Sequence, residues 1–373
     1  MTPGPPRAVR YRNLDVLRLV AASSVIFSHG FLIAERTEAN EPFKILSGDI
    51  LGLYGVYTFF IISGLLVTES WVSTPGMAGF VWRRFLRLYP AYLVCMAVTL
   101  TIAGLFFYPD GGLLDFLRAD ARTIVKHLAY LVGDGFFSGV KYYAHTADFS
   151  EGEVNGSIWS LQQEIVCYGL LVVFAAARLW KPSLLIAALL VSTLALYKEW
   201  FGPEGVLEYF FYAIPSFVSG ALAWWLLKVH RPNVWIALAC AAVIGAALLV
   251  HKTMFVFPPC AAYLILYLGV SAPFDLRTPR WLGDVSYGAY LYGWPVEQMV
   301  KIALGERAAW WQVFGLGLAG ALTLGFISWR LIEKPALRLK GVVPADWSLD
   351  RKVADVARAR LPRPGARRPA SGT

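Results

Sequence analysis

Long apolar stretches separated by short polar segments dominate this sequence. Ten stretches have the length and composition of membrane-spanning helices, at residues 14–33, 50–71, 88–108, 159–179, 183–200, 207–228, 234–250, 254–271, 282–303 and 310–332. A helix needs about 20 apolar residues to cross the ~30 Å hydrocarbon core of a bilayer. The pattern therefore predicts an all-α, polytopic membrane protein with about ten transmembrane helices.

Two parts of the chain differ in composition. Residues 1–342 contain all the apolar stretches and form one predicted transmembrane domain, whereas residues 343–373 are rich in Arg, Pro, Ala and Gly. Because such a composition cannot bury a core, we expect the second part to be a disordered basic tail. No small-residue cleavage site follows the first stretch, so we interpret it as a retained helix and not a signal peptide. The long connection at residues 109–158 is of a length that usually has a function.

Basic residues are distributed unevenly over the connections. An even number of spans places both termini on one side, and that side carries the basic residues at positions 7, 10, 12, 83, 84, 87, 178, 181, 228, 231, 277, 280, 334, 338 and 340. The positive-inside rule then predicts that both termini are cytoplasmic, in a plasma (bacterial inner) membrane. The net charge of +9 follows largely from this asymmetry. Since no basic segment is interleaved with aromatic residues, we expect no nucleic-acid partner.

The four cysteines lie inside apolar stretches, at positions 95, 167, 240 and 260. Their spacing matches neither a C-x-x-C motif nor a disulfide framework. We therefore expect them to pack as small hydrophobic residues, and we expect no metal site.

Two ionisable residues share the first apolar stretch. Arg18 and His29 are eleven positions apart, which in a helix is ~1100° of rotation and about 16 Å along the axis, so both lie on one face. Ionisable groups at membrane depth are costly and tend to mark a site or pathway. His29 suits a general base near neutral pH. The alternatives are a helix–helix hydrogen bond for His29 and an interfacial ion pair between Asp15 and Arg18.

A basic cluster precedes the third apolar stretch. Arg84 and Arg87 are three residues apart, so a helix would present both guanidinium groups on one face. Such a pair suits a phosphate. Anchoring under the positive-inside rule explains a basic run at this place equally well, so the cluster alone leaves both interpretations open.

The fourth stretch begins with Trp159-Ser160-Leu161-Gln162-Gln163-Glu164. At ~1.5 Å per residue, Glu164 lies about 7 Å below the start of its helix and His29 about 6 Å below the outer end of the first helix. A carboxylate at this depth could hold a His ring in one tautomer and stabilise its charged form. Alternatively, Glu164 pairs with another polar side chain, and Trp159 only anchors the helix at the interface.

Two other segments combine glycine with polar residues. The second stretch contains Gly55 to Gly64, and small residues there permit close helix packing. The ninth contains Ser286 to Glu297, where Pro295 should kink the helix and free backbone groups. We interpret the first segment as packing, and Glu297, near the outer end, as a surface residue.

Taken together, these segments resemble the acyltransferase-3 family of integral membrane O-acyltransferases over residues 12–340. The resemblance rests on pieces that occur in order: Asn13-Leu14-Asp15-Val16-Leu17-Arg18 followed by His29, Gly55…Phe59-Phe60…Ser63-Gly64, Arg84-x-x-Arg87 with Tyr89-Pro90, Asn155-Gly156-Ser157-Ile158-Trp159-Ser160-Leu161 leading to Glu164, Ser286-Tyr287 with Tyr290-Leu291, and Ile332-Glu333-Lys334-Pro335. Each piece is short, but their joint presence in this order is specific.

The resemblance implies that an acyl group, most simply acetyl, passes from cytoplasmic acyl-coenzyme A to a hydroxyl of a glycan or lipid-linked sugar at the outer face. It implies that His29 is the catalytic base. By the same resemblance, Arg84 and Arg87 hold the phosphates of coenzyme A. A long, thin pantetheine arm would then pass Arg18 to reach His29.

The remaining site residues follow from this scheme. Glu164 would orient His29 or stabilise its charge, and Arg18 would line the channel or polarise the thioester carbonyl as an oxyanion donor. Asn155, Trp159 and Ser160 are assigned to acceptor binding.

Two positions depart from the family's pattern. Gly293 stands where members often carry a His, so that His cannot act here, and Gln162 stands where a Pro often precedes the Glu, so the acceptor pocket can differ. Two other functions are open: a glycolipid transporter or flippase, and a non-catalytic membrane scaffold. The sequence shows no inverted repeat or paired broken helices of the transporter kind, and coenzyme A binding would separate acyl transfer from both.

Overall fold

The structure is a computed structural model that describes residues 11–73, 76–108, 112–130, 137, 140, 153–198, 206–276, 278–279 and 281–343, with only the backbone at 130 and 206–212. The predicted basic tail at 343–373 lies outside these residues except for its first. Most of the long connection at 109–158 also lies outside them.

Within the described residues the fold is helical, with no strand. A helix occupies each of the ten ranges that the sequence pattern predicts, so the all-α prediction is confirmed. The elements are α1 (Leu14–Glu35), α2 (Pro42–Ser47), α3 (Leu51–Ser73), α4 (Met77–Phe106), α5 (Leu113–Ala119), α6 (Ala121–Tyr130), α7 (Trp159–Ala176), α8 (Pro182–Tyr197), α9 (Val206–Leu226), α10 (Val234–Leu249), α11 (Thr253–Val270), α12 (Ser286–Leu304), α13 (Trp310–Ser328), a π-helix (Trp329–Glu333), α14 (Lys334–Arg338) and a 3₁₀ helix (Leu339–Gly341).

Six helical segments of the described chain are long and apolar enough to cross a membrane, namely α1, α3, α4, α7, α11 and the run Trp310–Gly341. Shorter apolar helices lie at α8, Ala213–Leu226 of α9, and α10. The ninth range, which contains α12, is the remaining one, and α12 buries Glu297, Gln298 and Lys301 along with its apolar residues. The number of ten spans and the side of the termini stay predictions.

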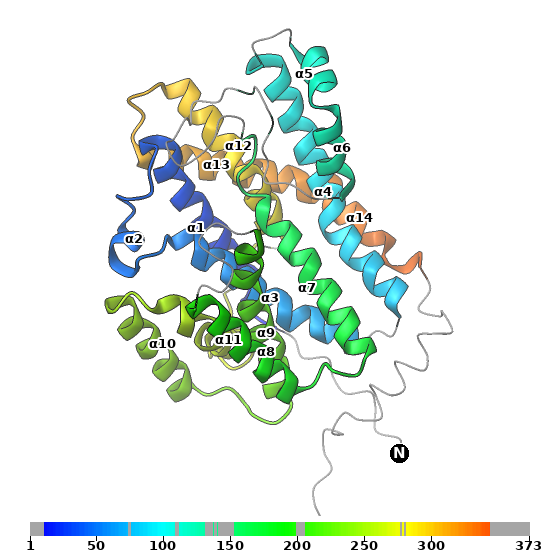
Figure 1. Ribbon diagram of the computed structural model, residues 1–373, viewed down its shortest axis with the longest axis vertical. Helices are drawn as coiled ribbons and strands as arrows, with labels where there is room; N and C mark the ends of the chain where they lie inside the picture. The colour runs from blue at the N-terminus through cyan, green and yellow to red at the C-terminus, as the bar shows by residue number, and fades with distance from the viewer. Residues whose placement is uncertain are drawn as a thin grey trace, which may run out of the picture.

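Helix α4 is longer than its apolar part. The sequence pattern placed the start of the third span at residue 88, but the helix begins at Met77 and runs for 30 residues. At ~1.5 Å per residue that is about 45 Å, which exceeds the ~30 Å hydrocarbon core. The arginine cluster at 83–87 is therefore part of the helix and is held rigidly. Figure 1 shows α5 and α6 beside the C-terminal half of α4. Near the middle of α4, Tyr92 Oη donates to the carbonyl of His127 at 2.9 Å.

Glycine allows α3 and α9 to cross with backbones in contact. A Cβ on Gly64 would overlap the carbonyl oxygen of Phe217, and a Cβ on Gly220 would overlap that of Ile61. Small residues permit this close approach between membrane helices. The packing interpretation of the Gly55–Gly64 segment thus holds for its glycines, since a Cβ on Gly55 would lie 2.6 Å from the carbonyl oxygen of Ala21.

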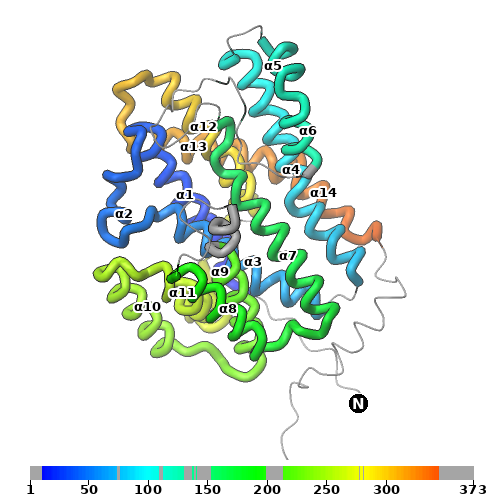
Figure 2. The backbone as a smooth tube through the Cα atoms, in the orientation of Figure 1, coloured from blue at the N-terminus to red at the C-terminus, as the bar shows by residue number. Residues whose placement is uncertain are grey.

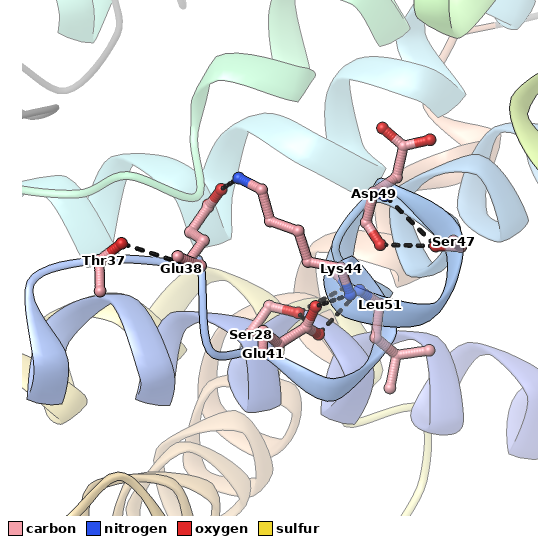
Figure 3. Close-up of polar contacts among 10 residues, drawn as sticks. Ser28, Thr37, Glu38, Glu41, Lys44, Ser47, Asp49 and Leu51 are labelled. Atoms are coloured by element: carbon pink, nitrogen blue, oxygen red, sulfur yellow. Dashed lines mark hydrogen bonds and ion pairs between the residues drawn. The ribbon is translucent and has the colours of Figure 1, made fainter. Parts of the chain in front are cut away.

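The short helix α2 is tied to α1 by a buried carboxylate (Figure 3). Glu41 is 0% exposed, and its oxygens accept from Ser28 Oγ at 2.9 Å, the Leu51 amide at 2.9 Å and the Lys44 amide at 3.0 Å. The Ser28 hydroxyl in turn accepts from the Gly52 amide at 2.7 Å. Since every partner is satisfied, Glu41 fixes the connection between α1 and α3.

The chain after α13 returns along α4, as the backbone trace in Figure 2 shows for α14. Trp82 Nε1 donates to the carbonyl of Leu339 at 2.9 Å and holds this segment in place. The π-helix turns Glu333 inward, where it is 1% exposed. Such π-bulges are frequent at functional sites.

Candidate active site

A cavity of about 370 Å³ lies among α1, α3, α4, α7, the start of α12 and the segment after α13. Its polar and charged lining consists of Arg18, Ser63, Arg83, Arg84, Arg87, Ser160, Glu164, Tyr168, Asp284, Ser286, Tyr287, Tyr290 and Lys340. Five of these side chains are basic and two are acidic, so the cavity suits an anion of high charge.

Asp284 joins two of the predicted arginines. Its Oδ2 lies 2.7 Å from Arg87 Nη2 and 3.5 Å from Arg18 Nη1, and its Oδ1 accepts from Ser286 Oγ at 2.7 Å. Asp284 is not among the site residues that the sequence predicts. Its position two residues before the Ser286-Tyr287 motif was the only signal, and it says nothing about which helices the side chain meets.

Arg87 is further paired with a carboxylate of the π-helix. Arg87 Nη1 lies 3.7 Å from Glu333 Oε2, and Ser328 Oγ donates to Glu333 Oε1 at 3.1 Å. The guanidinium therefore has two carboxylate neighbours, Asp284 and Glu333. Because its charge is already compensated, Arg87 is bound into the cavity wall.

Arg84 differs from Arg87 in the groups that its guanidinium contacts. Its guanidinium lies over the rings of Phe80 and Tyr168, at 5.8 Å and 5.9 Å from their centroids, and no carboxylate of the described residues forms an ion pair with it. Within the described ranges its Nε is buried without a hydrogen-bond partner, as are Nε and Nη2 of Arg83. Buried donors without partners are rare and need an explanation. Together with Lys340 in the same cavity, these donors are available to a bound anion.

Glu164 lies in this cavity and not beside His29. Its Oε1 accepts hydrogen bonds from Ser63 Oγ at 3.2 Å and from Tyr168 Oη. The structure thus brings Glu164 together with Arg18, Arg84 and Arg87 as cavity lining. The depth argument from the sequence considered only axial position, and the side chain points toward another helix.

Of the three residues assigned to the acceptor, Ser160 and Asn155 contact α12. Ser160 Oγ and Tyr290 Oη are 2.6 Å apart, and Phe59 packs edge-on against Tyr290 at 5.6 Å between centroids. Asn155 is 0% exposed, and its Nδ2 donates to the carbonyl of Leu291 at 3.0 Å. Trp159 is half-buried and packs against the apolar core that includes Tyr290 and Leu291. Ser160 is the one of the three that lines the cavity.

His29 occupies a separate position farther along α1. It is absent from the residues that line the cavity. Its ring packs edge-on against Trp294, 4.9 Å between centroids, and its Nδ1 lies 4.0 Å from Glu297 Oε2. The interpretation of Glu297 as a surface residue was wrong, because the side chain is 0% exposed.

The structure also explains the departure at position 293. A Cβ on Gly293 would lie 2.8 Å from Cγ1 of Ile26, which is 0% exposed. A histidine therefore fits here only if Ile26 moves.

Neither metal nor disulfide chemistry is built into the described part of the chain. No group of three or more His, Cys, Asp or Glu residues there could hold a metal ion. The cysteines are free, and Cys95 and Cys167 are buried.

Comparisons with known proteins agree on one family. A family model described as "Acyltransferase domain" matches residues 11–330. Nodulation protein 10 of Rhizobium leguminosarum bv. viciae is 28% identical, over 88% of this chain and 94% of that protein. An O-acetyl transferase of Shigella phage Sf6 is 26% identical, over 86% of this chain and 94% of the relative. Peptidoglycan O-acetyltransferase OatA of Listeria monocytogenes is 25% identical, over 78% of this chain and 52% of that protein. No solved structure matches.

Proposed function

This chain belongs to the acyltransferase-3 family, and from that premise we propose that it moves an acyl group, acetyl in the simplest case, from cytoplasmic acyl-coenzyme A to a hydroxyl at the outer face of the plasma membrane. O-acyltransferase activity is the part that the relatives support directly. The observation that carries the donor assignment is the cavity with five basic and two acidic side chains.

The donor would bind with its phosphates at the arginine cluster. Arg84 would be the direct ligand, because among the described residues its guanidinium pairs with no carboxylate and its buried Nε has no acceptor. Arg87 and Arg18 stay bound to Asp284 and add charge and shape to the wall. The pantetheine arm would then extend past Arg18, Ser160 and Tyr290 toward His29, whose ring packs against Trp294 one turn along α12 from Tyr290. A guanidinium beside that path can polarise the thioester carbonyl.

His29 would act as the general base of the transfer. It takes the proton from the acceptor hydroxyl as that oxygen attacks the thioester carbon, the C–S bond breaks, and the proton is returned to the departing thiolate of coenzyme A. The products are an ester and free thiol. Glu164, held by Ser63 and Tyr168, would set the electrostatics at the thioester end of the cavity.

The acceptor would be a glycan or a lipid-linked sugar. One relative is named for O-acetylation of peptidoglycan, and such acceptors offer hydroxyl groups outside the membrane. Ser160 and Trp159, at the outer start of α7 in the predicted topology, would contact it, and Asn155 would shape its pocket from the turn before α7.

Two rivals make different predictions about the donor. A glycolipid transporter or flippase would use the polar cavity as a path and would not consume acyl-coenzyme A. A non-catalytic scaffold would bind no ligand at all. Binding and turnover of acyl-coenzyme A therefore separate the proposed function from both.

The test is turnover by the purified protein in nanodiscs. Radiolabelled acetyl-coenzyme A is added, and release of free thiol is followed for the wild type, His29→Ala and the matched control His251→Ala, whose side chain is exposed between α10 and α11. We expect a loss of ~10²–10⁴-fold for His29→Ala, the usual cost of removing a general base, and no loss for the control. Near-normal transfer by folded His29→Ala protein, or no binding of short and long acyl-coenzyme A donors, would overturn the proposal.

A further inference from the structure

Glu297 lies in a space that two glycines provide between three helices. On α13, a Cβ at Gly317 would overlap Glu297 Cγ, and on α1 a Cβ at Gly30 would lie 3.3 Å from Glu297 Oε1. Larger residues at either place would push the carboxylate aside. The helices α1, α12 and α13 are thus built to admit this side chain.

Burial of Glu297 lowers the stability of the fold, which indicates that the side chain has a function. Glu297 is 0% exposed, and neither carboxylate oxygen has a hydrogen-bond partner in the part of the chain that the structure describes. A buried polar group left without partners is destabilising, and a buried charge more so. Glu41, one helix connection away, is equally buried but has all its oxygens satisfied. The difference indicates that Glu297 has a role in the reaction, whereas Glu41 stabilises the fold.

His29 is the ionisable group that faces Glu297. Its Nδ1 is buried, lies 4.0 Å from Glu297 Oε2 and accepts or donates no hydrogen bond among the described residues. The ring keeps 12% of its surface exposed, and that surface excludes Nδ1. A distance of 4.0 Å exceeds a hydrogen bond, but catalytic hydrogen bonds are often long without substrate and shorten in the complex.

We propose that Glu297 is the positioning residue of the acyl transfer, receiving the Nδ1–H of His29 so that Nε2 is left unprotonated toward the acceptor hydroxyl. The inference rests on the proposed function and assigns the carboxylate that the sequence had placed at Glu164. During transfer, Nε2 takes the hydroxyl proton, Glu297 stabilises the imidazolium through Nδ1–H, and the proton leaves Nε2 for the coenzyme A thiolate. Glu297 itself neither gains nor loses a proton.

The first test compares Glu297→Gln with Glu297→Asp. Glutamine keeps the size of the side chain and removes the charge, whereas aspartate keeps the charge and leaves a gap in the glycine-lined space. Positioning of His29 predicts a kcat ~10²-fold below wild type for Gln, within the range for impaired general base catalysis, and a smaller loss for Asp, with KM for acetyl-coenzyme A unchanged in both. A packing role predicts the reverse order, because Gln fits and Asp does not.

The second test is a double-mutant cycle with His29→Ala. If Glu297 acts through His29, then Glu297→Gln lowers the residual thiol release of the His29→Ala protein by less than ~2-fold, because coupled residues are not additive. Glu41→Gln is the matched control. It should lower the unfolding temperature but leave kcat per folded molecule within ~2-fold, because Glu41 contacts Ser28 and backbone amides and not the His29 ring.

The outcomes separate this inference from the proposed function. Loss of activity in His29→Ala together with a larger loss for Asp than for Gln, or with fully additive effects in the cycle, overturns the role of Glu297 and leaves acyl transfer standing. Full activity in His29→Ala overturns the proposed mechanism itself, whatever Glu297 does.

Discussion

Truncation of Arg87 tests whether this arginine supports the cavity or binds the ligand. Its guanidinium lies 2.7 Å from Asp284 and 3.7 Å from Glu333, and the Arg87, Asp284 and Glu333 side chains are 20%, 15% and 2% exposed. With an effective dielectric constant of ~20, Coulomb's law gives a gross attraction of about 6 kcal/mol for the first pair and about 4 to 5 kcal/mol for the second. Relief of the guanidinium's burial cost offsets much of this, so breaking buried pairs typically costs ~3–5 kcal/mol net.

The lower end of that range applies to Arg87→Ala, because Asp284 keeps Arg18 at 3.5 Å and a hydrogen bond from Ser286. We measure thermal unfolding in nanodiscs by tryptophan fluorescence, for which the chain has 14 tryptophans. At ~2.1 cal/mol/K of unfolding entropy per residue, a chain of 373 residues shifts by ~1–1.5 °C per kcal/mol, so a loss of ~3 kcal/mol lowers the midpoint by about 3–5 °C. The double variant Arg87→Ala/Asp284→Asn should recover part of this loss, because it removes the carboxylate that the single variant leaves under-compensated.

The matched control is Arg84→Ala, which lies one helical turn away and takes part in no ion pair among the described residues. Its midpoint should fall by about 1–3 °C, less than for Arg87→Ala, since a partly buried cation over aromatic rings contributes ~0.5–2 kcal/mol. An unchanged midpoint for Arg87→Ala, with acyl-coenzyme A binding lost, would show that Arg87 serves the ligand directly and would refute the pairing argument.

Three further predictions follow from single positions. Arg84→Ala should weaken binding of acetyl-coenzyme A by ~10–150-fold in a direct binding assay, since a hydrogen bond to a charged group contributes ~1.5–3 kcal/mol. An unchanged Kd would show that the arginine cluster only anchors the helix at the membrane surface. Gly293→His should lower the unfolding midpoint without a gain in kcat, because its Cβ meets Ile26 at 2.8 Å and overpacking costs ~1–3 kcal/mol; normal stability would contradict the packing. Asp49→Asn should raise the unfolding midpoint at pH 7 but not at pH 3. Burial raises the pKa of the Asp49 carboxyl group, so the charged form destabilises the fold once the pH rises through that pKa. An increase in midpoint that is the same at both pH values would exclude this cause.

The length of the apolar stretches predicted where the helices lie. In a membrane the backbone N–H and C=O groups must be hydrogen-bonded within the segment, so a long apolar stretch there forms a helix. The same rule missed the start of α4, since an arginine-bearing helical extension beyond the hydrocarbon core carries no apolar signal. Side-chain partners were predicted less well. Arg18, Arg84 and Arg87 do line one cavity, but the sequence contained no information on helix rotation. Depth counting therefore matched Glu164 to His29, while the crossing of α1 and α12 brings Glu297 there.

The crossing of α3 and α9 has a consequence for how this sequence can change. The obstacle to a Cβ at Gly64 is the main chain at Phe217, and the obstacle at Gly220 is the main chain at Ile61. Since every amino acid carries that main chain, no replacement on the opposite helix can make room. In a saturation mutagenesis library, positions 64 and 220 should each accept glycine alone and show no second-site suppressor, whereas Arg87 and Asp284, whose constraint lies in side chains, should be replaceable together.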